Sequence, residues 1–169
     1  YYDQEQSSLD MSKTILDEVW DEFPNMTTAK LRSVLASFLF TGDDVFKEIS
    51  KLSGGEKCRI NLLKLMLSKS NLLLLDEPTT YLDLAHQIEI LELLKDLNNK
   101  TKKTIVIVIH ELNHAARYAH NLVCMKNGNI YSQGEVDDVF NENMLRDVFG
   151  VDSIVISDPI TQRPMCIPK

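Results

Sequence analysis

The chain has 169 residues, of which 44% are hydrophobic and 25% are charged, and its formal net charge is −7 at pH 7. This composition fits one globular domain with a real core and excludes a fibrous or disordered chain. The acidic balance lacks the clustered lysine and arginine of a nucleic-acid-binding surface, so we expect no direct DNA binding.

The cysteines and the apolar runs indicate a cytoplasmic protein. Cys58, Cys124 and Cys166 are odd in number and lack metal-ligand spacing, which predicts a reducing compartment. The longest apolar runs, 72–75 and 105–109, are the size of strands, whereas a membrane span needs ~20 residues. The first residue is tyrosine rather than methionine, so we expect the sequence to begin inside a longer reading frame.

The first 70 residues read as helical. Ser12 can cap a first helix, and Thr27 or Thr28 can cap a second. Apolar side chains recur through the second helix at helical spacing, which predicts a buried face. A third helix is expected from Ser53 to about Lys69.

Strands and helices alternate after residue 70. The run 71–76 is apolar without alternation, which predicts a strand covered on both faces of a parallel sheet. The elements expected after it are helices at about 84–97 and 112–119, a strand at 104–109, a hairpin at 121–132, short helices at about 135–140 and 143–149, and a strand at 153–156. This order is typical of stacked βαβ units in an α/β fold.

Residues 52–57, Leu-Ser-Gly-Gly-Glu-Lys, open the third helix. Ser53 can cap it, while Gly54 and Gly55 would let an oxyanion approach the exposed backbone N–H groups. The positive end of the helix dipole favours a phosphate at that place. By itself, the run would also fit a plain loop before a helix.

Residues 72–79, Leu-Leu-Leu-Leu-Asp-Glu-Pro-Thr, place two carboxylates where a buried strand ends. Ligands of open α/β folds bind at this carboxyl edge of the sheet. Asp76 suits Mg²⁺, which prefers oxygen ligands, and Glu77 could orient or deprotonate an attacking water. Taken alone, the pair would also fit the start of a loop.

The order and spacing of these segments resemble those of the ATP-binding-cassette (ABC) ATPases. Residues 52–56 match the signature motif, 72–77 the Walker B strand and 82–83 the D-loop. His110 matches the switch histidine, and Gln4 resembles the Q-loop glutamine. The resemblance implies an α/β fold with a RecA-like parallel sheet core and a helical signature subdomain, here a partial domain divided into 5–70 and 71–169.

The resemblance also implies the chemistry of one site. Asp76, together with Gln4, would hold Mg²⁺. Glu77 would act as the base toward water, and His110 would sense the γ-phosphate of ATP. The remaining histidines, His86, His114 and His120, match no family role and are expected to be ordinary helix-face residues.

The signature residues would serve a second site, in which ATP is held by a second ABC ATPase domain. Ser53, Gly54, Gly55 and Glu56 would contact that nucleotide, with Ser53 and Gly55 at its γ-phosphate. Asp83 would communicate across the dimer.

The phosphate-binding loop of this class does not occur in the sequence. No Gly-x-x-x-x-Gly-Lys-Ser/Thr is found in the 169 residues, although its N–H groups and lysine supply most of the phosphate binding. We therefore expect an N-terminally truncated domain without the Walker A loop and the antiparallel strands near it. Two copies of the chain would then make no competent site, whereas one copy with an intact partner could make one.

Two subfamilies are represented. Residues 1–79 resemble the ABC-F proteins, many of which act on the ribosome, and 76–169 resemble ATPase subunits of ferric siderophore and cobalamin importers. An ABC-F domain would usually have Asn-His at 80–81 and Asp-Arg at 111–112, where this chain has Thr-Tyr and Glu-Leu. A natural hybrid, a recombination product and a misjoined frame would all give this pattern.

We predict an importer ATPase subunit that binds ATP and Mg²⁺, is cytoplasmic or peripheral at the inner face of the plasma membrane, and has membrane permease subunits as partners. One alternative is an ABC-F translation factor that binds the ribosome. The other is an inactive fragment, or a donor of the signature half alone.

Overall fold

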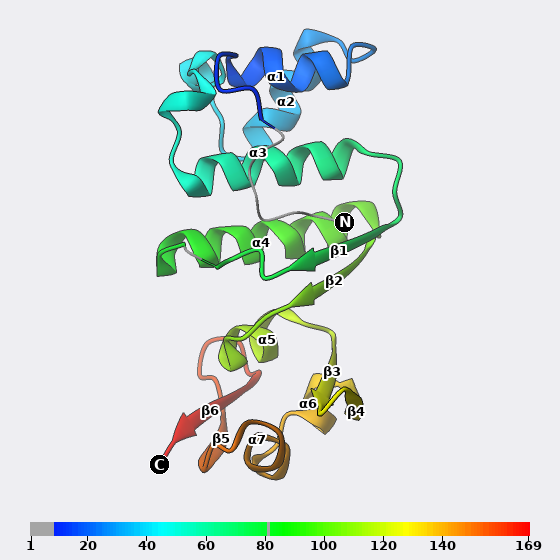
Figure 1. Cartoon of the computed structure of the whole chain (residues 1–169), viewed down its shortest axis with the longest axis vertical. Coiled ribbons are helices and arrows are strands. Elements are labelled where there is room, and N and C mark those ends of the chain that lie inside the picture. The colour runs from blue at the N-terminus through cyan, green and yellow to red at the C-terminus, as the bar shows by residue number, and fades with distance from the viewer. Residues whose placement is uncertain (1–8, 81) are drawn as a thin grey trace. The chain divides into compact units, whose positions relative to one another are not determined.

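The computed structural model of the chain describes residues 9–80 and 82–169 (Figure 1). By its internal contacts the chain divides into two compact units, and the boundary in the sequence lies between Val108 and Ile109. We call the described residues up to Val108 the first unit and the rest the second unit. The division into 5–70 and 71–169 that the sequence favours stays a prediction.

The first unit combines helices with two strands. Its elements are α1 (Ile15–Glu22), α2 (Thr28–Ser37), the short 3-10 helices η1 (Gly42–Phe46) and η2 (Ile49–Lys51), α3 (Gly54–Leu67), β1 (Leu72–Asp76), α4 (Leu84–Thr101) and β2 (Thr104–Val108). In the described part of the chain, none of the helices has the length and apolar character that a bilayer crossing requires.

Threonine side chains cap the first two helices. Thr27 caps α2 as predicted, but Thr14 rather than Ser12 caps α1, where its hydroxyl oxygen accepts a hydrogen bond from the backbone N–H of Asp17 at 3.2 Å. The hydroxyl of Ser12 instead donates to Asp10 at 2.6 Å. The prediction at Ser12 was therefore wrong because a local acceptor engages that side chain.

Helix α3 runs between the α1–α2 pair and α4 (Figure 1). Buried apolar side chains of all four helices form the core around it. A charged network also joins α1 to α3: the Lys64 ammonium lies 2.8 Å from the carboxylates of both Glu18 and Glu22. Burial lowers the pKa of Lys64, but hydrogen bonds to the two carboxylates outweigh it and leave the pKa above its ordinary value.

Strands β1 and β2 pair in parallel, with Leu72 opposite Thr104 and Asp76 opposite Val108. The predicted coverage of both faces is wrong for the described residues. Along β1, Leu73 and Leu75 are buried on the helices, but Leu72 is 53% exposed on the other face. Helices of the first unit pack on one face of the pair, and among the described elements of that unit none covers the other face.

The second unit is built from two hairpins and three short helices. Its elements are α5 (Leu112–Tyr118), β3 (Asn121–Lys126), β4 (Asn129–Glu135), α6 (Val136–Val139), α7 (Glu142–Phe149), β5 (Ser153–Ser157) and β6 (Pro164–Pro168). The predicted turn between β3 and β4 is confirmed, since Asn127 and Gly128 have φ of 50° and 76°. Strand β6, which pairs antiparallel with β5, was not predicted.

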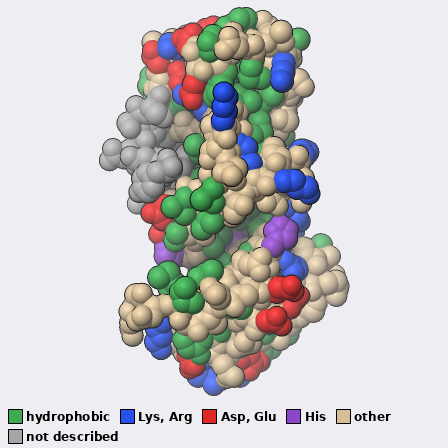
Figure 2. Space-filling model, turned by 90° about the vertical axis from the view of Figure 1, so that its right-hand side faces the viewer, with side chains coloured by type: hydrophobic (Ala, Val, Ile, Leu, Met, Phe, Trp, Pro, Cys, Tyr) green, Lys and Arg blue, Asp and Glu red, His purple; other side chains and the backbone are tan. Residues whose placement is uncertain are grey.

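All three cysteines are buried thiols, with Cys58 in the first core and Cys124 and Cys166 in the second. Hydrophobic side chains also remain on the surface, where Figure 2 shows them in patches among polar groups.

Candidate functional site

The signature segment forms a reciprocal cap at the start of α3. The hydroxyl oxygen of Ser53 accepts a hydrogen bond from the backbone N–H of Glu56 at 3.2 Å, and the backbone N–H of Ser53 donates to the Glu56 carboxylate at 2.8 Å. Ser53 and Glu56 therefore fix the turn. The hydroxyl proton of Ser53 is not used in this cap, and Gly54 beside it is exposed, so this corner can still receive an anion.

Gly55 has a steric role that the sequence did not reveal. It is buried, and a Cβ atom added to it would lie 2.6 Å from Cδ2 of His86. The imidazole of His86 therefore lies directly against Gly55, and any larger residue there would force the ring to move. The anion approach predicted at Gly55 stays a prediction, whereas contact with the ring is what this backbone shows. His86 is thus more than an ordinary helix-face residue.

The same imidazole also binds the D-loop residue. Asp83 caps α4: its Oδ1 accepts a hydrogen bond from the backbone N–H of His86 at 3.0 Å and lies 2.8 Å from Nδ1 of the ring. The backbone N–H of His86, and then its ring, hold the pKa of Asp83 below its ordinary value. Asp83, His86 and Gly55 therefore form one continuous connection between the D-loop and the signature turn.

The acidic pair lies at the carboxyl end of β1, as predicted. Asp76 is exposed there, and Glu77 has a φ of 44°, in the left-handed region that a non-glycine residue rarely adopts. The backbone N–H of Glu77 donates to Val108 at 3.1 Å, its carbonyl accepts from the backbone N–H of Thr80 at 3.1 Å, and the Thr80 hydroxyl donates to its carboxylate at 2.8 Å.

Such strain costs about 1–3 kcal/mol and persists only where neighbours hold it, most often at functional sites. Hydrogen bonds at both the backbone and the carboxylate of Glu77 hold this conformation. Thr80, which the sequence motifs did not single out, supplies two hydrogen bonds to Glu77.

The loop after the acidic pair also contacts the signature helix. The thiol of Cys58, one turn into α3, donates to the carbonyl of Pro78 at 3.6 Å, and both residues are buried. The structure thus brings the Walker B end, the D-loop and the signature turn together within the first unit.

The described residues contain no group of three His, Cys, Asp or Glu side chains arranged to hold a metal ion. Mg²⁺ in nucleotide sites needs no such cage, since one or two carboxylates suffice when phosphate and water oxygens complete the shell. The exposed carboxylate of Asp76 fits that mode of binding.

The other predicted site residues lie outside the first unit or outside the described residues. His110 belongs to the second unit, where it is exposed and separated from α5 by Glu111 alone. Gln4, the predicted Q-loop glutamine, lies outside the described residues.

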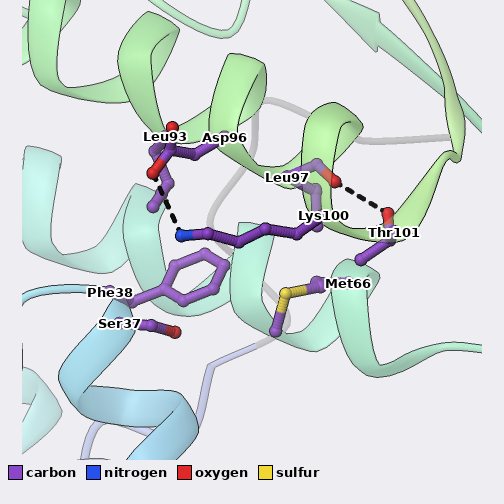
Figure 3. Close-up of a pocket in the computed structure, with 8 residues that line it drawn as sticks. All are labelled: Ser37, Phe38, Met66, Leu93, Asp96, Leu97, Lys100 and Thr101. Carbon is purple, nitrogen blue, oxygen red and sulfur yellow. Dashed lines mark hydrogen bonds and ion pairs between the residues drawn. The ribbon is translucent and has the colours of Figure 1, made fainter.

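A shallow cavity at the other end of α3 is not part of this site (Figure 3). It is lined by Ser37, Phe38, Met66, Leu93, Asp96, Leu97, Lys100 and Thr101. Its polar groups already bind one another, as Lys100 lies 3.1 Å from Asp96 and the Thr101 hydroxyl donates to the carbonyl of Leu97. At ~1.5 Å per residue, Met66 and Ser53 are about 20 Å apart along α3.

A capped Ser-Gly-Gly turn and two carboxylates at the end of a parallel strand are the features expected of an α/β domain that binds phosphate groups. The ABC transporter family matches residues 1–80. The iron(3+)-hydroxamate import ATP-binding protein FhuC of Bacillus subtilis (strain 168) is 45% identical over 121 residues, 72% of this chain and 45% of that protein. YdiF of the same organism is 56% identical over 92 residues, 54% of this chain and 14% of that protein.

Solved structures agree with the sequence relatives. The ATP-binding cassette MJ0796, in a dimeric post-hydrolysis state bound to ADP and Pi, matches 78% of this chain and 60% of its own with a TM-score of 0.61 and 25% identity. These matches show that the chain is similar to ABC transporter ATPases, and its relatives include ATP-binding proteins of siderophore importers. It spans about half the length of the curated importer relatives it matches.

Proposed function

We propose that the chain supplies the Walker B, signature and switch parts of the ATPase subunit of an iron-siderophore type importer. The observation that carries the proposal is Glu77, held in a strained conformation at the end of β1 by hydrogen bonds to Val108 and Thr80. The 45% identity to FhuC supports the importer over the ABC-F alternative.

In this proposal Glu77 polarises the water that attacks the γ-phosphate. Its carboxylate is oriented by the Thr80 hydroxyl, so little reorganisation is needed when the water arrives. Asp76, with Gln4, would contribute oxygen ligands to Mg²⁺, which would supply neutralisation of the phosphate charge. His110 would donate a hydrogen bond toward the γ-phosphate.

The signature turn would act on nucleotide held by a second ABC ATPase domain. Ser53 and Gly54 offer the accessible donors, while Glu56 fixes the turn and Gly55 keeps it against His86. Asp83 would communicate across the dimer. The dimeric MJ0796 supports two-domain assembly, and the name of FhuC supports a membrane permease as a further partner and a peripheral location at the cytoplasmic face.

The testing experiment measures Mg-ATP binding and hydrolysis by the 169-residue chain, alone and mixed with intact FhuC. We expect no turnover alone and ATP-dependent association in the mixture, which Ser53→Ala weakens and Ser50→Ala, at an exposed serine outside the signature, does not. Turnover by the chain alone that Glu77→Gln abolishes would show a phosphate site within these residues. If the chain neither hydrolyses ATP alone nor associates with FhuC in the presence of ATP, the inactive-fragment alternative is favoured.

A further inference from the structure

Both ends of the short helix α5 are tied to the segment that holds β6, one to the strand itself and the other to Arg163, the residue before it. At its first turn, the side-chain oxygen of Asn113 accepts a hydrogen bond from the backbone N–H of Cys166 at 2.8 Å, and its amide nitrogen donates to the Cys166 carbonyl at 3.2 Å. At the other end, the Arg163 guanidinium donates to the carbonyl of Ala119 at 2.5 Å. We propose that the β5–β6 hairpin is a positioning element for the switch histidine, His110, and that Asn113 is the residue through which it acts.

The contact at Asn113 has the form of a strand pairing. Cys166 lies opposite Val155 in the β5–β6 register. In an antiparallel pair, alternate residues direct their N–H and C=O groups away from the partner strand. Both groups of Cys166 bind the amide of Asn113, which therefore occupies the place of a third strand. An amide side chain offers a donor and an acceptor side by side in one plane, as a peptide group does.

Helix α5 needs such external ties. It has seven residues, far fewer than an isolated helix requires, and its N-cap, Glu111, makes no capping hydrogen bond through its side chain. Ala116 is buried in the second core, and Leu112 and Ala119 pack against that core. These apolar contacts are non-directional, so the two polar ties are the contacts that fix the ends of α5 along the direction of β6.

The position of α5 bears directly on His110, because only Glu111 separates the histidine from the helix. The backbone N–H of Ala115 donates to the carbonyl of Glu111 at 2.9 Å, so the linking residue belongs to the first helical turn. A displacement of α5 along β6 must therefore move His110. The role of His110 toward a nucleotide rests on the proposed function. The placement of His110 by the β5–β6 hairpin does not.

The test uses NMR of the 169-residue chain without nucleotide. The imidazole carbon–proton signals of the four histidines are assigned by single substitutions and compared at one pH in Asn113→Ala and in a matched control, Asn141→Ala. Asn141 is also exposed, lies in the same unit, and caps α7 by accepting from the backbone N–H of Met144 at 3.0 Å. We expect Asn113→Ala to displace the His110 signal several-fold more than the control does.

Two further readouts separate positioning from plain stability. Asn113→Asp keeps the acceptor for the N–H of Cys166 but loses the donor, so its effect on the His110 signal should be intermediate. Amide exchange at Ala115 and Ala119 should accelerate on the order of 10-fold in Asn113→Ala, because two hydrogen bonds are lost.

Equal His110 shifts in the two alanine variants would overturn the proposal, as would faster exchange in β6 with an unmoved His110. If Asn113→Ala unfolds the second unit, Arg163→Gln at the other end of α5 is read in the same way against Asn141→Ala. Because no nucleotide is involved, a failure here leaves the ATPase proposal standing, and an inactive ATPase leaves this result standing.

Discussion

Because Gly55 lies against His86, we expect the effect of Gly55→Ala on stability to change sign when His86 is replaced by alanine. In the unchanged chain, Gly55→Ala places a Cβ atom 2.6 Å from the His86 ring. The ring must then move, and the 2.8 Å contact between its Nδ1 and Asp83 is lost or stretched. We therefore expect Gly55→Ala to destabilise the first unit.

The magnitude follows from three effects. Replacing glycine by alanine in a helix is by itself favourable by up to about 1 kcal/mol. Overpacking costs about 1–3 kcal/mol, and the exposed contact between the ring and Asp83 is lost with it. The net loss should be about 1–2 kcal/mol. In a His86→Ala background the collision is absent, so Gly55→Ala should be neutral or stabilising, and the coupling between the two sites should be about 2 kcal/mol.

Urea unfolding of the four chains in this cycle measures the coupling. The single tryptophan, Trp20, lies in α1 and reports on the first unit through its fluorescence. Additive effects of the two substitutions, with Gly55→Ala costing the same in both backgrounds, would refute the argument that the ring is what requires a glycine.

Three further predictions use the same assay. Lys64→Met should destabilise the first unit by about 3 kcal/mol, because Glu18, which is 5% exposed, loses its cation; an unchanged urea midpoint would contradict this. Glu77→Gly should stabilise the chain by about 1 kcal/mol, because glycine adopts a φ of 44° without strain; a loss of stability would show that the Thr80 contact outweighs the strain. The pKa of Asp83 is lowered by the His86 backbone N–H and ring, so the cap of α4 is complete above the ordinary value of 3.8 and is lost as pH falls through the folded value. The stability difference between the chain and Asp83→Asn should therefore shrink below about pH 4, and a constant difference would count against the cap.

The local elements were largely predictable because local signals determine them. Ser53 followed three residues later by Glu56 is a capping box, and the structure forms it. The strand before Asp76 follows from its unbroken leucines, and the turn at Gly128 from the need for positive φ. Each of these signals lies within a few residues of the feature it specifies.

Contacts between distant residues were not predictable from the pattern. The reason for Gly55 is a histidine on another helix, and no local rule connects the two. The exposed face of β1 could not be foreseen either, because a run of leucines does not tell how many faces its neighbours cover. Strand β6 begins and ends in proline, which hides it from strand propensity, although its edge is completed by Asn113.

The reaction rates of the three buried thiols can measure how often the core around each thiol opens. Cys58 lies in the first core, and Cys124 and Cys166 lie in the second. Burial raises the pKa of the Cys124 and Cys166 thiols and so slows their reaction with alkylating reagents. Timed alkylation followed by mass spectrometry of the labelled peptides would record how often each core opens, without any engineered probe. Native material could thus report the separate opening rates of its two halves.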